Sequence, residues 1–374
     1  MTSQLFTPIA LRGLTQPNRI VVAPMCQYSA VDGSATDWHI LHLGSLAVAG
    51  PGLVMIEATG VEAEGRITPG CLGLYSDANE AALSRAVDAC RAYGKAPIGI
   101  QLAHAGRKAS CHVPWQGGGP LAAGDGAWQT VGPSAVSFDD GWHTPRALDR
   151  AGMDHVKAAF LAAAGRAQRL GLDLIEMHSA HGYLMHQFLS PFSNRRTDEY
   201  GGSLENRMRF PLEVARALRQ AWPEEKPFGV RISASEWMDG GFTIDEAVVY
   251  CRALKAIGCD YICVSSGGNA AKARIPFGPN YQVPFAARIR KEAGIATRAV
   301  GLIVEPHQAE AILAEGEADM VALARGFLDD PHWVWHAAEA LGADAVYPPQ
   351  YLRCKPATWP GARIARGEPK TKVA

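Results

Sequence analysis

The chain has 374 residues, a length that suits one large α/β barrel or two ordinary domains. Hydrophobic residues make up 48% of the chain and its formal net charge is −1, so a sizeable core is expected and nucleic acid or membrane-surface partners are not. No apolar run reaches the roughly 18 residues of a membrane span, and the first nine residues lack the pattern of a signal peptide.

The pattern along the chain predicts eight strands, each followed by a helix. Residues 4–18, which contain several helix and strand breakers, are expected to form a capping segment in front of them. Apolar runs predict strands at 19–24, 52–58, 96–103, 172–178, 227–233, 260–265, 298–301 and 319–324. Amphipathic stretches predict helices at 37–49, 79–93, 150–170, 204–222, 244–257, 283–293, 306–314 and 331–341. Strict alternation of eight such units favours a single-domain (β/α)8 TIM barrel.

One long stretch, residues 106–146, interrupts the alternation after the third strand. It is rich in glycine and proline, contains Trp115, Trp128 and Trp142, and excludes long regular elements. Long loops inside a compact domain are usually functional, so we expect a lid over a site; the alternative is a solvent-exposed insertion. The barrel domain is predicted to span residues 1–346, and residues 347–374 to form a tail that packs on the rim or on a neighbouring subunit.

Eight cysteines are scattered along the chain without a Cys-x-x-Cys pair, which argues against a zinc ribbon or an iron–sulfur cluster. We interpret them as reduced thiols of a cytoplasmic protein. At the end of the predicted fourth strand, His178, His181 and Tyr183 follow one another within six residues, and barrel enzymes carry their chemistry at such strand ends. Two neutral imidazoles and a phenol could hold a carbonyl oxygen and supply a proton. A structural histidine or a His-x-x-His zinc ligand pair is the alternative, although no third ligand with matching spacing is evident, so no metal is expected.

The ends of the other strands carry few carboxylates. Gly301, Ala324 and Arg325 follow the last two strands, where barrels commonly bind phosphate. Arg231 and Arg325 could instead form structural ion pairs, and Glu176 is interpreted as a paired carboxylate inside the barrel. The site therefore resembles one for a phosphate-bearing cofactor next to the donors of the fourth strand, and the absence of Gly-x-Gly-x-x-Gly after a strand speaks against a Rossmann nucleotide site.

Several motifs in sequence order resemble those of the Old Yellow Enzyme family of FMN-dependent ene-reductases, in particular its bacterial branch of xenobiotic reductases and thermophilic-type ene-reductases. The motifs are Ala23-Pro-Met-Cys-Gln-Tyr28, Ile56-Glu-Ala-Thr59, Gln101-Leu-Ala-His-Ala-Gly-Arg-Lys108, His178-Ser-Ala-His-Gly-Tyr183, Gln187-Phe-Leu-Ser-Pro191 and the run from Asn194 to Arg207. The resemblance covers nearly the whole chain.

The resemblance implies a non-covalent FMN across the barrel mouth. The residues that would hold it are Ala23, Pro24, Met25, Cys26, Ala58, Gln101, Arg231, Gly301, Ala324 and Arg325. It implies that Arg231 faces the N1/O2 edge of the flavin, that Gly301, Ala324 and Arg325 hold the phosphate, and that Cys26 tunes the flavin potential and substrate binding.

The resemblance also implies the reaction. His178 and His181 would bind the carbonyl oxygen of an α,β-unsaturated ketone or aldehyde, with nitro compounds as a further candidate class, and Tyr28 would add a phenol contact. Hydride would pass from flavin N5 to the β-carbon and Tyr183 would protonate the α-carbon, with NADPH or NADH as electron donor in ping-pong order. The implied activity is that of an NADPH dehydrogenase and ene-reductase.

In this branch, C-terminal residues reach into the active site of a neighbouring subunit, often with an arginine after a Gln-Tyr pair. Gln350-Tyr-Leu-Arg353 fits that pattern, so the resemblance implies a homodimer or homotetramer in which Arg353, with Tyr351, contacts substrate at the partner's site. Two other readings stay open at this point: a flavin-binding barrel with another role, such as a redox sensor, and a metal-dependent hydrolase.

Overall fold

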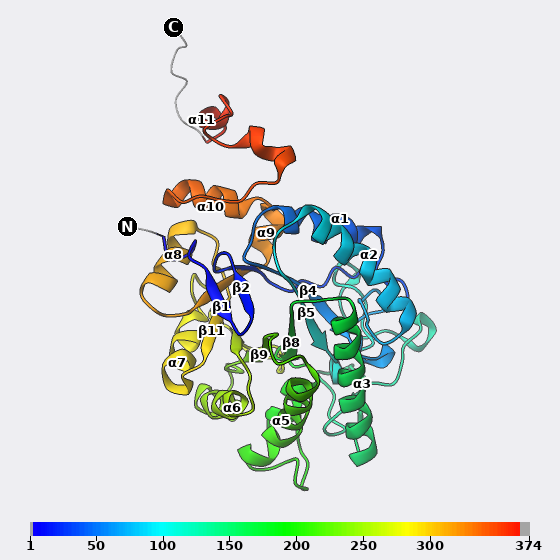
Figure 1. The fold of residues 1–374 in the computed structure, drawn as a ribbon. Coiled ribbons are helices and arrows are strands. Elements are labelled where there is room, and N and C mark those ends of the chain that lie inside the picture. The colour runs from blue at the N-terminus through cyan, green and yellow to red at the C-terminus, as the bar shows by residue number, and fades with distance from the viewer. Residues whose placement is uncertain (1–2, 367–374) are drawn as a thin grey trace.

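The computed structural model describes residues 3–366, and its centre is a closed barrel of eight parallel strands (Figure 1). In chain order the strands are β3 (Ile20–Val22), β4 (Leu53–Gly60), β5 (Ile98–Ala103), β8 (Leu174–Ser179), β9 (Phe228–Ser233), β10 (Tyr261–Ser265), β11 (Ala296–Ala299) and β12 (Met320–Leu323). Each strand pairs with the next along the chain, and β12 pairs with β3 to close the ring. The predicted (β/α)8 barrel is confirmed.

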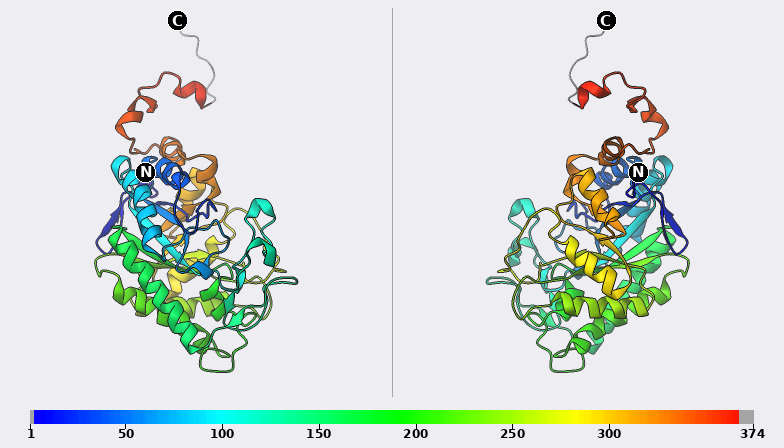
Figure 2. Two further views of the ribbon diagram at one scale, coloured as in Figure 1. Left: turned by 90° about the vertical axis from the view of Figure 1, so that its right-hand side faces the viewer. Right: turned by 90° about the vertical axis from the view of Figure 1, so that its left-hand side faces the viewer.

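Helices surround the barrel (Figure 2). They are α1 (Asp37–Val48), α2 (Asp77–Tyr93), α3 (Arg150–Arg169), α5 (Leu204–Ala221), α6 (Ile244–Ala256), α7 (Val283–Ala293), α8 (Pro306–Ala314) and α10 (Trp333–Leu341). Capping chemistry in the sequence sets their ends: the Thr243 side chain accepts from the Glu246 N–H at the start of α6, and Gly294 ends α7 with φ +62°. The predicted bounds of strands and helices agree with the observed ones to within two residues.

The N-terminal capping segment forms a hairpin of two three-residue strands, β1 (Ile9–Leu11) and β2 (Leu14–Gln16). Leu11 packs with Leu53, Leu174 and Tyr261 in one buried cluster, and these three residues begin β4, β8 and β10. The hairpin therefore closes the end of the barrel where the strands begin. The sequence did not predict these strands, nor the short helices α4 (Leu184–Leu189) and α9 (Arg325–Asp329).

The interior of the barrel holds a buried ion pair. Oε2 of Glu176 lies 3.0 Å from Nη1 of Arg298, and both side chains are fully buried. The same carboxylate accepts hydrogen bonds from Gln101 Nε2 at 2.7 Å and from the Tyr261 hydroxyl at 2.8 Å. This confirms the interpretation of Glu176 as a paired carboxylate inside the barrel.

The insertion 106–146 contains only short elements. They are the 3-10 turns η2 (Gly106–Lys108), η3 (Pro114–Gln116) and η4 (Ala123–Asp125), and β6 (Val131–Gly132), which pairs with β7 (Arg146–Ala147) at the end of the insertion. The first turn of the insertion is hydrogen-bonded to the loop after β10, since Nη2 of Arg107 donates to the Asn269 carbonyl at 2.7 Å. The ring centroid of Trp115 lies 5.9 Å from that of Tyr28. The insertion thus contacts the mouth of the barrel.

After α10 the chain leaves the barrel as an arm, which contains η5 (Pro349–Cys354) and α11 (Ala362–Ala365) and extends away from the helices in Figure 1. The side chains of Tyr351, Leu352 and Trp359 on this arm are 42%, 46% and 40% exposed. The last eight residues of the predicted tail, 367–374, lie outside the described residues. From residue 3 to residue 366, no helix has the length and apolarity that a bilayer crossing needs.

Candidate active site

The turn after β8 brings His178, His181 and Tyr183 together. His178 is near the end of the strand, and the chain then turns through His181 at φ +59° and Gly182 at φ +74°. A side chain at Gly182 would lie 2.3 Å from the Gly268 carbonyl oxygen, so glycine is required there. The ring centroid of His178 lies 5.0 Å from that of His181 and 4.8 Å from that of Tyr183. The predicted cluster is therefore present.

Hydrogen bonds define the tautomer of His178 and link it to His181. Nδ1 of His178 accepts from the Ala180 N–H at 3.2 Å, so in the neutral ring the proton is on Nε2. That Nε2 lies 3.3 Å from Nδ1 of His181, whose own Nε2 lies 2.8 Å from the Ser265 hydroxyl oxygen. Burial, and then the nearby charge of Arg231, lower the pKa of both imidazoles well below the usual value, so both rings are neutral.

The run after β3 lies next to this cluster. Cys26 is partly buried, and burial together with the Glu57 carboxylate raises the pKa of its thiol, which is therefore protonated at neutral pH. Tyr28 has φ +50°, and its phenol pKa is raised by burial and by the neighbouring Cys26. Burial, with contributions from Cys26 and Tyr28, also raises the pKa of Tyr183 well above its usual value. The thiol and both phenols are therefore protonated at neutral pH.

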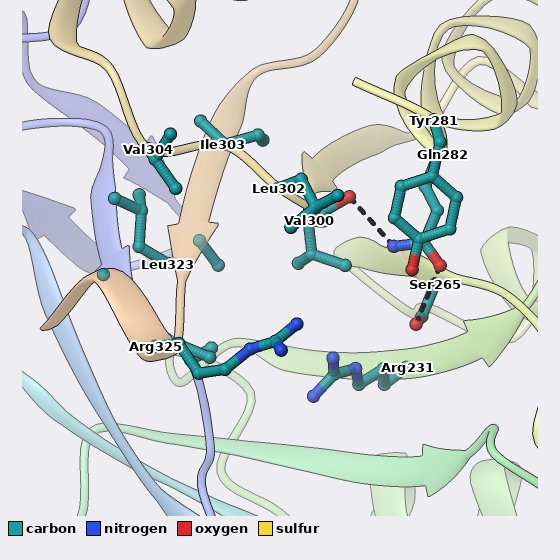
Figure 3. A pocket seen from close by; sticks show the side chains of 15 residues that line it. Arg231, Ser265, Tyr281, Gln282, Val300, Leu302, Ile303, Val304, Leu323 and Arg325 are labelled. Carbon is teal, nitrogen blue, oxygen red and sulfur yellow. Dashed lines mark hydrogen bonds between the residues drawn. The ribbon is translucent and has the colours of Figure 1, made fainter. Parts of the chain in front are cut away.

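A pocket opens beside the ends of β11 and β12, and Figure 3 shows its lining. The residues around it are Ala23, Arg231, Ser265, Tyr281, Gln282, Val300, Gly301, Leu302, Ile303, Val304, Ala322, Leu323, Ala324, Arg325 and Gly326. The Gln282 amide donates to the Val300 carbonyl at 3.0 Å and orders one wall. Gly301 has φ +110°, and a Cβ there would lie 2.4 Å from the Gln282 amide nitrogen, so glycine keeps this edge open.

Arg231 and Arg325 point into this pocket with their guanidinium groups toward one another (Figure 3). Neither forms an ion pair with a carboxylate of residues 3–366, and the buried Nε of Arg231 has no hydrogen-bond partner there. Two unneutralised cations beside a glycine edge fit an anionic ligand. The residues present therefore fit the phosphate of a bound nucleotide.

The structure brings most of the predicted site residues to one end of the barrel. Arg231 on β9 lies opposite His178 on β8 in the strand register, and Ala58 on β4 lies opposite Gln101 on β5. Gln101 donates from its amide nitrogen to Glu176 at 2.7 Å, which leaves its amide oxygen to accept other hydrogen bonds. Arg353 is different, because it is exposed on the C-terminal arm and outside this cluster within its own chain.

Sequence reasoning missed two residues of the site. The first is Lys108, whose Nζ donates to the carbonyls of His181 and Gly268 at 2.9 and 2.7 Å. It belongs to the motif that begins at Gln101, but the sequence assigned it no role. The second is Gln282, whose Oε1 accepts hydrogen bonds from the hydroxyls of Ser266 at 2.6 Å and Ser265 at 3.3 Å. The clue for Lys108 was its place two residues after Gly106 at the start of the insertion, while nothing in the sequence marked Gln282.

Comparison with known proteins agrees with this geometry. A sequence model of the "NADH:flavin oxidoreductase / NADH oxidase family" matches residues 4–344. The chain belongs to this family, the Old Yellow Enzymes. It is an FMN-dependent oxidoreductase. This family membership decides against the two alternatives, a metal-dependent hydrolase and a flavin-binding barrel with another role.

Individual relatives of this Old Yellow Enzyme cover between 90% and 96% of its length. A protein named "NADPH dehydrogenase" from Geobacillus sp. (strain WCH70) is 45% identical over 94% of this chain and 99% of its own. A structure of morphinone reductase is 29% identical, with a TM-score of 0.76 over 96% of this chain and 93% of the other. A 2-naphthoyl-CoA reductase structure is 25% identical, with a TM-score of 0.81 over 90% of this chain, which spans only 52% of that longer protein.

Proposed function

We propose that this enzyme reduces the C=C bond of α,β-unsaturated aldehydes and ketones, with electrons from NADPH or NADH. The observation that carries the proposal is the convergence of two neutral histidines and a tyrosine beside a pocket with two unpaired arginines. FMN, when bound, would accept hydride from the nicotinamide and deliver it to the alkene. The name of the Geobacillus relative supports NADPH as the donor. Nitro compounds are a further candidate class.

The residues proposed to hold FMN surround the mouth on several strand ends. They are Ala23, Pro24, Met25 and Cys26 after β3, Ala58, Gln101, Arg231, Gly301, Ala324 and Arg325. Arg231 would contact the pyrimidine edge, where a fixed cation favours negative charge, and Arg325 would bind the phosphate. Cys26 would adjust the flavin potential and Tyr28 would contact the substrate.

His178 and His181 would bind the substrate carbonyl oxygen and draw electron density from the double bond. His178 already has its proton on Nε2, on the side of His181. For His181 to donate from Nδ1 to the substrate, the proton of its neutral ring must be on Nδ1 and its Nε2 must accept a hydrogen bond. The Ser265 hydroxyl, 2.8 Å from that Nε2, can donate it, because a hydroxyl serves as donor or acceptor. A polarised alkene would then receive its proton at the α-carbon from Tyr183.

The purified protein tests this function directly. We expect a yellow protein whose flavin absorbance is bleached anaerobically by NADPH or NADH and is restored by 2-cyclohexenone, with saturated cyclohexanone as product. Each half-reaction should proceed without the other reactant, as ping-pong kinetics require. A protein that is bleached by a nicotinamide nucleotide but never reoxidised by enones, enals or nitroalkenes would contradict the proposed substrate class.

Replacement of His178 by alanine tests the carbonyl anchor. We expect the variant to retain FMN but to bind a phenolic ligand such as p-hydroxybenzaldehyde at least about tenfold more weakly, because one hydrogen bond to the ligand oxygen is lost. The measurement is a titration of the flavin spectrum with the phenol. The exposed His155, which pairs with Glu62 at 2.8 Å, provides the control variant His155→Ala. Unchanged phenol affinity in His178→Ala would contradict the role.

Replacement of Arg325 by alanine tests the phosphate site. The wild-type apoprotein should bind FMN much more tightly than riboflavin, and Arg325→Ala should lose about tenfold or more of FMN affinity, as expected for a charged hydrogen bond of about 1.5–3 kcal/mol. Riboflavin affinity should stay within about twofold. Fluorescence titration of the apoprotein with both flavins measures this. Equal losses for the two flavins would contradict a contact to phosphate.

We further propose that the C-terminal arm, residues 347–374, packs on a neighbouring subunit of a homodimer or homotetramer, with Arg353 and Tyr351 at the partner's site. The exposed apolar side chains on the described part of this arm support the proposal, since packing would cover them. Light scattering of the full chain and of a chain ending at residue 346 tests it. We propose that the enzyme acts in the cytoplasm, which suits its eight free cysteines.

A further inference from the structure

Lys108 extends from the start of the insertion to the turn that bears the histidines. Its ammonium group donates to the carbonyl oxygens of His181 and Gly268 at 2.9 and 2.7 Å. The same nitrogen lies 5.4 Å from the ring centroid of Tyr183 and 4.6 Å from that of Phe138. Lys108 is thus a cation above the face of the proposed proton donor.

This cation has no anion beside it. Within residues 3–366, no carboxylate lies at ion-pair distance from the Lys108 nitrogen. The charged and titratable groups that face it are Arg107 on the same turn, Tyr183, three neutral histidines (His178, His181 and His186) and Cys111, whose pKa burial raises to about 12. A partly buried ammonium without a counter-charge is costly, which suggests that an anion forms near it during the reaction.

We propose that Lys108 stabilises the negative charge on the Tyr183 oxygen after Tyr183 has donated its proton to the substrate. The inference rests on the proposed function. In that step the O–H bond of Tyr183 breaks, a C–H bond forms at the α-carbon, and the electron pair of the O–H bond stays on the tyrosine oxygen. Tyr183 then recovers a proton from water. Lys108 acts through Tyr183 and does not touch the reacting carbon.

Burial shifts the pKa values of both Tyr183 and Lys108. Burial raises the pKa of Tyr183, so a tyrosinate there is unfavourable unless a cation lies nearby. Burial lowers the pKa of Lys108 to about 8, so the cation is present at neutral pH and is lost as the pH rises through about 8. The rate of alkene reduction should therefore fall above about pH 8.

The test compares two oxidants of the reduced holoenzyme by stopped-flow absorbance. 2-Cyclohexenone needs a proton on carbon from Tyr183, whereas p-benzoquinone accepts hydride and exchanges protons on oxygen with water. Lys108→Met should slow reoxidation by cyclohexenone about tenfold and by benzoquinone less than twofold, and should remove the alkaline fall in rate near pH 8. The exposed Lys95 provides the control variant Lys95→Met, which should behave as wild type.

A double variant separates this role from a purely structural one. Lys108→Met added to Tyr183→Phe should slow cyclohexenone no further, because no tyrosinate forms. Additive losses, or equal slowing with both oxidants, would overturn the proposal and leave Lys108 as a brace for His181. If Lys108→Met does not fold, the wild-type pH profile decides: an alkaline fall with cyclohexenone and not with benzoquinone is expected, and no difference overturns the proposal. Failure of Tyr183→Phe to slow cyclohexenone would instead contradict the proposed function.

Discussion

Tyr183→Phe should slow reoxidation of the reduced enzyme by 2-cyclohexenone by about 100-fold or more. The physical reason is that the variant keeps the ring beside His178, 4.8 Å between centroids, but has no proton to give to the α-carbon. Loss of a general acid typically costs two to four orders of magnitude. Reduction of the flavin by NADPH needs no such proton, so its rate should change by less than about threefold. Stopped-flow absorbance of the two separate half-reactions measures both rates.

The control for this experiment is Tyr93→Phe, because Tyr93 is 65% exposed at the end of α2 and far in sequence from the cluster. It should leave both half-reactions unchanged. A Tyr183→Phe variant that slows both half-reactions alike would show that the hydroxyl positions ligands generally and that another group protonates the substrate.

Glu176→Ala should strongly destabilise the barrel interior. It leaves the guanidinium group of Arg298 buried without its carboxylate, and it removes the acceptor of the Gln101 amide and the Tyr261 hydroxyl. Breaking a buried ion pair by removing one partner costs about 3–5 kcal/mol. We therefore expect the free energy of unfolding to fall by that amount, measured by urea denaturation of the holoenzyme.

A double variant shows whether the charge is the cause. Glu176→Ala combined with Arg298→Met removes both members of the pair and should be more stable than Glu176→Ala alone, since no buried charge is left unpaired. If the double variant is as unstable as the sum of its parts, the loss comes from packing and the electrostatic explanation is wrong. A loss below about 1 kcal/mol in Glu176→Ala would contradict it as well.

The sequence predicted the regular part of the fold because each barrel strand is an apolar run bounded by polar or breaking residues. The hairpin β1–β2 and the helices α4 and α9 were missed, since elements of three to six residues are too short for a periodic pattern. α4 begins directly after Tyr183, in a stretch that the sequence presented as a motif and not as a helix.

The site was predictable where function and local sequence coincide. His178, His181 and Tyr183 are close in the chain, so one turn places all three. The contacts of Lys108 were not predictable, because its partner His181 is 73 residues away in the chain. The tautomer of His181 likewise depends on Ser265, which is 84 residues away on β10, and no local pattern reports such a contact.

The hairpin β1–β2 and the residues packed under it close the barrel at the end where its strands begin. In the proposed function, cofactor, nucleotide and alkene therefore enter from the opposite end of the barrel, and nucleotide and alkene bind in turn. In that arrangement the flavin would lie beneath the other ligands, so any ligand bound over it would also block its escape. Retention of the cofactor is in this way coupled to turnover. An enzyme saturated with substrate or with a phenol should release FMN more slowly than the enzyme without such a ligand, even if the ligand makes no direct contact with the residues that hold FMN.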